Sequence, residues 1–221
     1  MSRGLGDVYK RQNDYFDYWA GHSDKFLEAL GGHFALVGAV IAISLVLCAV
    51  IVLLIMNNKR AQRGVLSVCE AIYSIPSLAL FSILIPFTGL GFGTAVLVMV
   101  LYNQFLLVRN VTEGLNDVDH SVVEAAEGMG MSPWQVLCKI KLPLAMPMIV
   151  AGIRLALIST IGIATIAATI NAGGLGTILF TGLRTMNEYQ IVGGVLLCAL
   201  VALVADIVLR SIEFVIKKKA A

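Results

Sequence analysis

The sequence predicts an all-α, polytopic membrane protein with about five transmembrane helices. Of its 221 residues, 58% are hydrophobic and only 14% are charged, which is far more apolar than a soluble globular domain. The apolar residues also form blocks of roughly 20 residues, the length that an α-helix needs to cross the hydrocarbon core of a bilayer. Both observations place the chain among proteins with several membrane spans.

Hydropathy places five spans along the chain. The third is short for a transmembrane helix, so either it begins earlier or the preceding turn at 88–93 lies partly within the membrane. The five expected spans are Phe34–Met56, Val65–Pro86, Gly93–Val108, Leu144–Ile170 and Ile191–Leu209.

Basic residues predict the orientation, because short loops rich in Lys and Arg stay in the cytoplasm. With five spans, the N-terminus is expected outside, and the C-terminus and the long loop 109–143 are expected in the cytoplasm. On the outer side the main basic residues are Lys25 and Arg184. The basic residues assigned to the cytoplasm are Lys59, Arg60, Arg63, Arg109, Lys139, Lys141, Lys217, Lys218 and Lys219.

The transmembrane domain is expected to span 34–216, between an N-terminal segment 1–33 and a cytoplasmic basic tail 217–221. Met1–Gln12 is polar and basic and fits neither a signal peptide nor a span. Aromatic residues at 15–19 precede an amphipathic stretch, Asp24–Leu30. This pattern is typical of a helix lying at the outer membrane interface; a plain outer tail is the alternative.

The polar loop between the third and fourth spans predicts two short helices joined by a turn. Ser121–Glu124 is expected to open the first helix as a capping box, and Ser132–Gln135 to open the second, with a proline at its first position. Gly130 suits the left-handed residue at a helix C-terminus. Pro143 is expected to end the second helix. Such a helix-turn-helix on a membrane protein would hold a cytoplasmic partner.

Metal sites and common catalytic motifs are not expected. The four cysteines form no CxxC pair, and His22, His33 and His120 share no ligand spacing. The chain contains no G-x-x-x-x-G-K-[ST] phosphate loop and neither a G-x-S-x-G nor an H-E-x-x-H motif. The chain is therefore expected to be non-enzymatic, without a cofactor of its own.

A membrane-anchored, DNA-reading helix-turn-helix is a weaker alternative. Binding to the phosphate backbone requires a basic face, but acidic residues outnumber basic ones in this loop, so no nucleic acid is expected as a partner. The charged residues of the loop's centre are Glu113, Asp117, Asp119, Glu124 and Glu127 against Lys139 and Lys141.

The same loop carries a family resemblance. Glu124-Ala125-Ala126, three residues, Gly130, nine residues, Ile140, one residue and Leu142-Pro143 match the cytoplasmic signature of permeases from binding-protein-dependent ABC importers. The resemblance covers about 34–210. Methionine and other amino-acid importer permeases share the plan and remain the alternative. Five further segments resemble the osmoprotectant permeases that import glycine betaine, carnitine or choline: Ile75–Phe81, Val108–Asn110, Gly128–Trp134, Ala151–Arg154 and Ala172–Gly176.

The resemblance implies a type I importer in a bacterial inner membrane. Two permeases, identical or paralogous, would form the pathway, and an external binding protein would select the substrate. A separate subunit would use ATP and Mg²⁺ and receive the loop. Glu124 would cap its helix, pair with a basic residue of that ATPase, or do both. The residues implied in coupling are Glu124, Ala125, Ala126, Gly130, Ile140, Leu142 and Pro143.

Polar residues within the spans are the candidates for lining a pathway. Pro76 would interrupt the backbone hydrogen bonding of the second span, although Ser and Thr in membrane helices also bond simply to their own or a neighbouring helix. Asp206 and Arg210, four residues apart, are expected to pair. A secondary transporter is less favoured, because no buried relay of acids is evident. The pathway candidates are Ser74, Pro76, Ser77, Asn103, Thr160, Thr165 and Asn171.

Overall fold

The computed structural model describes residues 14–220, which form helices and contain no strand. Four helices are long and apolar enough to cross a membrane, and one bent pair would make a fifth span, which confirms the expected all-α membrane fold. Residues 14–21 are helical. The further elements are α2 (Ser23–Ile55), α3 (Lys59–Tyr73), α4 (Ser77–Thr88), α5 (Phe92–Asn116), α6 (His120–Gly128), α7 (Pro133–Val136), a π-helical turn (Leu137–Lys141), α8 (Leu142–Ala167), a 3₁₀ turn (Ala168–Ile170), α9 (Gly176–Thr185) and α10 (Glu188–Ala220).

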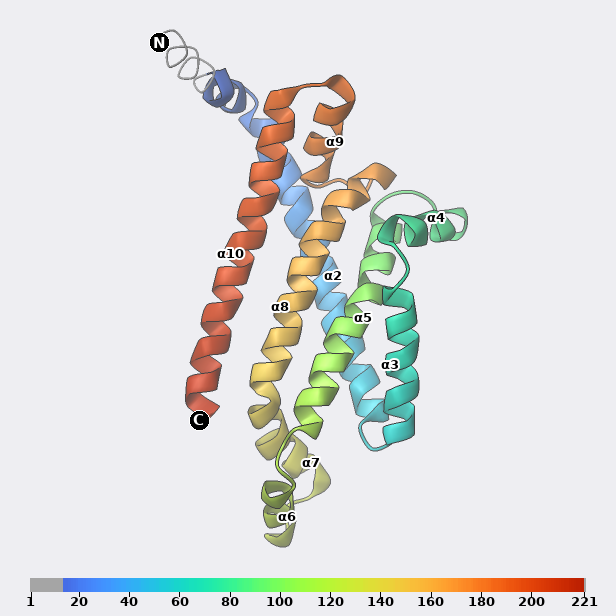
Figure 1. The fold of residues 1–221 in the computed structure, drawn as a ribbon, viewed down its shortest axis with the longest axis vertical. Coiled ribbons are helices and arrows are strands. Elements are labelled where there is room, and N and C mark those ends of the chain that lie inside the picture. Colours follow the sequence, from blue (N-terminus) through green and yellow to red (C-terminus); the bar gives the residue numbers. More distant parts are fainter. Residues whose placement is uncertain (1–13, 221) are drawn as a thin grey trace, which may run out of the picture.

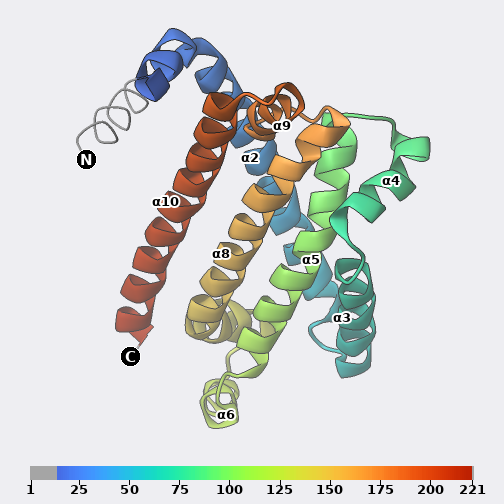
Figure 2. The same cartoon turned by 45° about the horizontal axis from the view of Figure 1, so that its top comes forward.

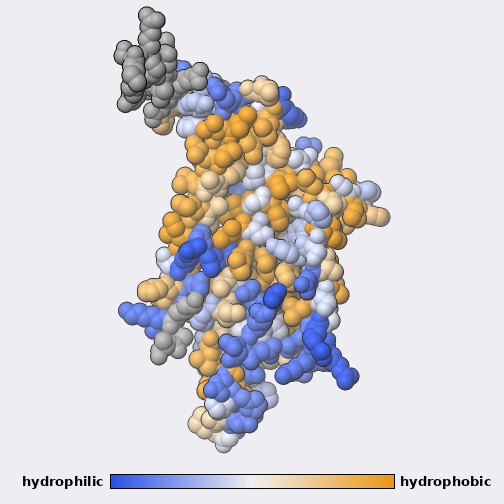
Figure 3. Space-filling view, in the orientation of Figure 1, coloured by the Kyte–Doolittle hydropathy of each residue, from blue (hydrophilic) through white to orange (hydrophobic). Residues whose placement is uncertain are grey.

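The long helices run side by side, with α5 and α8 at the centre (Figure 1). Helices α6 and α7 and the C-terminal end of α10 lie at one end of the bundle, whereas α9 and the N-terminal end of α2 lie at the other (Figures 1 and 2). Apolar side chains cover much of the upper and middle surface, and hydrophilic ones gather toward the α6 end (Figure 3). This distribution suits a bundle that spans a bilayer.

Helix α2 is longer than its expected span. It is one continuous helix of 33 residues, or about 50 Å at 1.5 Å per residue, against a hydrocarbon core of about 30 Å. The expected interfacial helix over the aromatic residues 15–19 and Asp24–Leu30 is not one separate element: 14–21 are helical, and Asp24–Leu30 form the first turns of α2. No proline interrupts the helix at this point, so nothing forces a break between the amphipathic and the apolar parts. The expectation for Met1–Gln12 lies outside the described residues.

The second expected span, Val65–Pro86, is broken. Helices α3 and α4 meet at a bend of 95°, because Pro76 has no N–H to donate and disfavours a helical conformation at Ile75. The freed backbone groups find other partners: the hydroxyl of Tyr102 donates to the Ile75 carbonyl. At the end of α3 the Glu70 carbonyl accepts from both the N–H and the hydroxyl of Ser74, at 2.9 Å and 2.8 Å. A straight transmembrane helix here is ruled out.

Helix α5 forms the centre of the bundle and is longer than the expected Gly93–Val108 span. More than half of its most apolar stretch, 56%, is buried, because α5 packs against α2, α3 and α8. Glycines allow its close approach to α8. A Cβ on Gly152 would lie 2.6 Å from the Asn110 Cβ, and a Cβ on Gly114 would lie 2.8 Å from the Met148 Cβ. Small residues at helix crossings are the usual means of packing membrane helices.

A charged cluster joins α8 to α10. Arg154 Nη1 donates to Asp206 Oδ1 at 3.1 Å, and its Nε lies 3.4 Å from Glu213 Oε2. Arg210 Nε lies 2.7 Å from Asp206 Oδ2, which confirms the expected pairing. The Arg154 and Asp206 side chains are only 22% and 24% exposed. Because little water reaches these charges, each is stabilised mainly by its charged partners.

Replacing Arg154 with methionine should destabilise the protein by about 2 kcal/mol, because removing one member of a largely buried charge cluster leaves its partners unpaired. Thermal unfolding of the purified protein in nanodiscs would measure the change. Arg210→Gln is the control, since the Arg210 side chain is 67% exposed and exposed pairs contribute less than about 1 kcal/mol. Equal losses from both variants would contradict a special role for Arg154.

Candidate functional site

The first helix of the loop between the third and fourth spans, α6, is capped by Asp119 and not by Ser121. Asp119 Oδ1 accepts hydrogen bonds from the backbone N–H and the hydroxyl of Ser121, both at 2.9 Å. The hydrogen bonds from the backbone and the side chain of Ser121 hold the pKa of the Asp119 carboxyl below its usual value. The predicted Ser121–Glu124 capping box is therefore wrong. Glu124 instead lies 3.1 Å from His120 Nδ1, one helical turn earlier, and is exposed.

The second helix begins as expected. Ser132 Oγ accepts from the Gln135 N–H at 3.3 Å, Gln135 Oε1 accepts from the Ser132 N–H at 2.8 Å, and Pro133 is the first helical residue. Between the helices, Gly130 has φ +82° and no neighbour within 4 Å of a Cβ built upon it. Gly130 therefore supplies a left-handed backbone and leaves open space beside it within this chain. We call the unit 120–136 the hairpin.

The hairpin is continuous with a membrane-spanning helix. Pro143 does not end the second helix: Pro133–Ile170 is one apolar helical stretch of 38 residues. A π-helical turn at Leu137–Lys141 precedes the proline, and the Leu142 N–H bonds to the Leu137 carbonyl, five residues back. The altered hydrogen-bond register of such a turn accommodates the missing donor of Pro143. A force on α7 therefore acts directly on α8.

The resemblance-implied coupling residues differ in exposure. Glu124, Ala125, Gly130 and Pro143 are exposed, Ile140 and Leu142 are half-buried, and Ala126 is only 1% exposed. Ala126 thus packs inside the hairpin, whereas Ala125 faces outward.

Two apolar side chains that sequence reasoning did not include among the coupling residues are also exposed on the hairpin. Met129 is 76% exposed and Trp134 is 63% exposed. Large apolar side chains on the polar tip of a membrane protein favour a protein partner. Both lie in the Gly128–Trp134 segment that carries the family resemblance, and this was the sequence signal for them.

Gly130→Ala should loosen the turn of the hairpin. A residue with a Cβ in the left-handed region costs roughly 1–2 kcal/mol, and the turn is closed by hydrogen bonds from Gly130 N–H to the Glu127 carbonyl and from Met131 N–H to the Ala126 carbonyl. Hydrogen exchange at the Met131 amide should accelerate about tenfold. Gly128→Ala, within α6 and equally free of neighbours, should leave exchange at Met131 unchanged. Equal effects would contradict the turn requirement.

Two of the pathway candidates lie in a buried polar network. Asn103 Nδ2 donates to Thr160 Oγ1 at 2.9 Å and to Ser44 Oγ at 3.3 Å, so the three side chains join α5, α8 and α2. Gln104 Nε2 also donates to the Ser44 carbonyl at 3.3 Å. Asn103 is 1% exposed and Thr160 is fully buried. In this conformation they bridge helices and do not reach open space. Sequence reasoning missed Ser44 and Gln104, whose signal was a polar residue inside an apolar span.

The other pathway candidates are scattered. Ser74 and Pro76 are exposed and Ser77 is half-buried, all at the bend between α3 and α4. Thr165 Oγ1 lies 3.4 Å from Cys198 Sγ, between α8 and α10. Asn171 is exposed, with a left-handed φ of 64°, just after the 3₁₀ turn. The candidates therefore form no single site within one chain.

Comparison with known proteins identifies the family. The model of the "Binding-protein-dependent transport system inner membrane component" family matches residues 42–221. The chain is 33% identical over 198 residues to the carnitine transport permease protein OpuCD of Listeria monocytogenes, covering 89% of each chain. It is 37% identical over 162 residues to the glycine betaine/carnitine/choline transport system permease protein OpuCD of Bacillus subtilis, covering 73% of this chain and 71% of that one.

A solved structure shares the fold. The inward-facing MetNI methionine ABC transporter matches with a TM-score of 0.72 and 24% identity over 86% of this chain and 93% of that chain. The family match rests on the segment that contains the hairpin and the helix continuous with it. The chain therefore belongs to the binding-protein-dependent transport system inner membrane components, as the non-catalytic, membrane-spanning permease subunit of an ABC transporter.

Proposed function

We propose that this permease imports quaternary-ammonium osmoprotectants such as glycine betaine, carnitine or choline, with energy from a separate ATPase. The observation that carries the substrate class is the likeness to permeases named for these compounds over 73–89% of the chain. A methionine or other amino-acid permease is the second candidate. It is favoured by solved structures of methionine and amino-acid ABC transporters at 17–24% identity, which bear on the fold alone.

The hairpin is the coupling element of this proposal. Its exposed surface, which includes Ala125, Met129 and Trp134, docks into a groove on the ATPase. Movement of the ATPase is transmitted through α7 and the π-helical turn to α8, because these segments form one helix. Ile140, Leu142 and Pro143 lie in this lever, whereas Ala126 and Gly130 shape the hairpin. The exposed Glu124, which lies beside His120, also meets a basic residue on the ATPase.

The proposed orientation puts the N-terminus outside and the hairpin and C-terminus in the cytoplasm. The start of α3, with Lys59 and Arg60, lies toward the same end of the bundle as α6 and α7 (Figure 1). Lys25 and Arg184 lie in α2 and α9 near the opposite end. Excess Lys and Arg in short loops marks the cytoplasmic side, which supports this direction and an inner-membrane location.

A second permease copy is proposed to cover the bend between α3 and α4. Helix α4 projects sideways from the bundle (Figure 1), with Phe87 82% and Ile83 55% exposed. A broken backbone at membrane depth is tolerated where protein or a water-filled cavity covers it. Both conditions are met if a second copy, identical or paralogous, packs here and the pathway runs between the copies, past Ser74, Pro76 and Ser77.

Uptake into proteoliposomes tests the proposal. The permease is reconstituted with its ATPase and binding protein, with ATP enclosed on the ATPase side, and accumulation of radiolabelled glycine betaine is compared with that of methionine. ATP-dependent uptake of glycine betaine, competed by carnitine and not by methionine, is the expected result. Uptake of methionine alone would replace the proposed function with the second candidate.

A further inference from the structure

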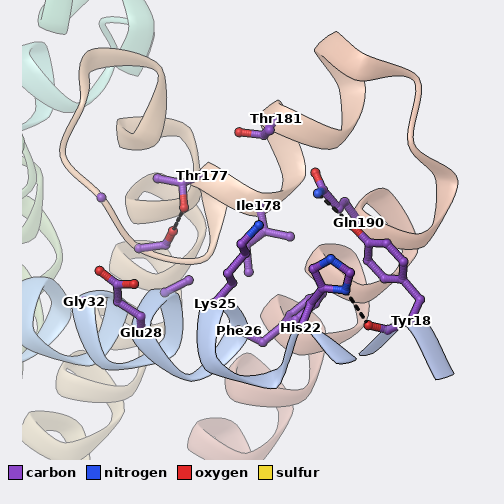
Figure 4. Close-up of a pocket in the computed structure, with 13 residues that line it drawn as sticks. Tyr18, His22, Lys25, Phe26, Glu28, Gly32, Thr177, Ile178, Thr181 and Gln190 are labelled. Atoms are coloured by element: carbon purple, nitrogen blue, oxygen red, sulfur yellow. Dashed lines mark hydrogen bonds between the residues drawn. The ribbon is translucent and has the colours of Figure 1, made fainter. Parts of the chain in front are cut away.

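A cavity of about 470 Å³ lies at the end of the bundle opposite the hairpin (Figure 4). Its floor is the first turns of α2, its roof is the Gly173–Gly174 loop and α9, and Gln190 of α10 lies at one side. The volume lies within the usual range for small-molecule sites, about 300–1,000 Å³. The pathway candidates and the hairpin lie elsewhere, so neither accounts for this cavity.

The wall near α10 is built from packed rings and a side-chain amide. Tyr18 stacks between His22 and Tyr189, with ring centroids 4.2 Å and 5.1 Å away, and its hydroxyl accepts from Gln190 Nε2 at 2.9 Å. The opposite end is closed by backbone: a Cβ on Gly32 would lie 3.5 Å from the Gly174 nitrogen. Because both faces of Tyr18 are covered, the cavity offers no open aromatic box for a cation.

The cavity contains both signs of charge. Lys25 and Glu28 rise from the same side of α2 toward the loop and α9 (Figure 4), and neither has an ion-pair partner among residues 14–220. Residues three apart on a helix are neighbours, so both charged side chains line the same cavity without pairing with each other. A ligand with both charges would complement this pair.

Two further atoms of the cavity wall, Gln190 Oε1 and His22 Nε2, have no hydrogen-bond partner among the described residues. Gln190 Oε1 is buried and has no hydrogen-bond partner in the described part of the chain, although an unsatisfied buried acceptor is costly. His22 Nδ1 lies 2.9 Å from the Tyr18 carbonyl, which can only accept, so Nδ1 carries a hydrogen and Nε2 is the ring nitrogen left for a ligand. The cavity therefore also suits a ligand with a hydroxyl group.

We propose that this cavity is a binding subsite for a small zwitterion, with Lys25 holding the carboxylate of the ligand and Glu28 holding its cationic nitrogen. The inference rests on the proposed function, because it takes the osmoprotectant itself as the ligand on the outer face of the permease. Glycine betaine and carnitine fit, carnitine adds a hydroxyl that can bond to His22 Nε2, and choline lacks the carboxylate. Exposed charges bind weakly, so the affinity is about millimolar, as suits a transfer site.

Binding to the permease–ATPase complex in nanodiscs, without the binding protein, tests the subsite. Titrations with glycine betaine, carnitine and choline should rank carnitine first and choline last, with choline about tenfold weaker than betaine. Lys25→Gln should weaken betaine binding about tenfold and abolish its advantage over choline, and Glu28→Gln should weaken all three ligands. Lys59→Gln, which removes an exposed lysine from α3 at the far end, is the matched control. Betaine binding that is absent, or identical in Lys25→Gln and Lys59→Gln, would overturn the proposal.

A zwitterionic lipid headgroup carries the same paired charges, so the titration is repeated in two lipids. Equal betaine affinity in phosphatidylglycerol and phosphatidylethanolamine nanodiscs supports a solute subsite. Binding that disappears in phosphatidylethanolamine identifies its headgroup as the occupant and overturns the solute subsite. Betaine-stimulated ATP hydrolysis with the binding protein present distinguishes failure of the subsite from failure of the proposed function. If betaine stimulates hydrolysis but does not bind at the cavity, only the subsite is wrong. If betaine does not stimulate the wild-type complex, the proposed function is wrong.

Discussion

Ala125→Glu should reduce ligand-stimulated ATP hydrolysis tenfold or more, while the permease itself remains folded. Ala125 is exposed on α6, so a larger side chain meets no obstacle within the chain. At a docked interface the same change introduces bulk and a charge that must lose its water without a partner, which costs several kcal/mol. ATP hydrolysis by the reconstituted complex and thermal unfolding of the permease alone would measure the two effects separately.

Ala125→Ser is the matched control, because it keeps a small side chain at the same position and should preserve coupling. Ala126→Glu should behave differently. Ala126 is 1% exposed, so a charge there disrupts the packing of the hairpin and lowers the melting temperature. Full stimulated activity in Ala125→Glu would show that this face of α6 does not contact the ATPase.

The largest expected loss of stability comes from Gly176→Ala. A Cβ on Gly176 would lie 1.9 Å from the Thr165 carbonyl oxygen and 2.8 Å from the Ala168 Cβ. Backbone cannot move aside as the end of a long side chain can, so the start of α9 must separate from α8. Overpacking of this kind costs about 3 kcal/mol or more. Thermal unfolding in nanodiscs, together with the yield of folded protein, would measure the loss.

Gly162→Ala makes the same substitution nearby with the opposite expectation. Gly162 lies within α8, and nothing lies within 4 Å of a Cβ built upon it. Alanine favours a helix interior over glycine by about 0.5–1 kcal/mol, so this variant should be as stable as the wild type or slightly more so. If Gly176→Ala and Gly162→Ala unfold at the same temperature, the result would contradict the close packing of α9 against α8.

Local signals predicted the structure best. The Ser132–Gln135 capping box and the left-handed Gly130 depend on a few adjacent residues, and both appear as expected. The other start signal failed because two short polar residues compete for one N-cap, and Asp119 takes the place expected for Ser121. Membrane-length apolar runs likewise predicted the spans, but not the 95° bend at Pro76, whose size depends on which neighbour receives the freed backbone groups.

Non-local features were beyond sequence reasoning. Whether Asn103 faces a pathway or a neighbouring helix depends on the rotation of α5 within the bundle, and the structure turns it toward Ser44 and Thr160. Pro143 was expected to stop a helix because its usual effect is to break hydrogen bonds, whereas a π-helical turn shifts their register just before it. The family signature was recognisable because its residues lie close together in the chain.

Site-specific photo-cross-linking tests most directly whether the hairpin is the contact with the ATPase. A photoreactive amino acid is placed at Ala125 on the hairpin or at Arg184, an exposed residue of α9 near the opposite end, and the assembled transporter is irradiated. The expected result is a cross-link to the ATPase from position 125 and none from position 184. Capture of the ATPase from position 184, with none from position 125, would contradict both the coupling role of the hairpin and the proposed orientation.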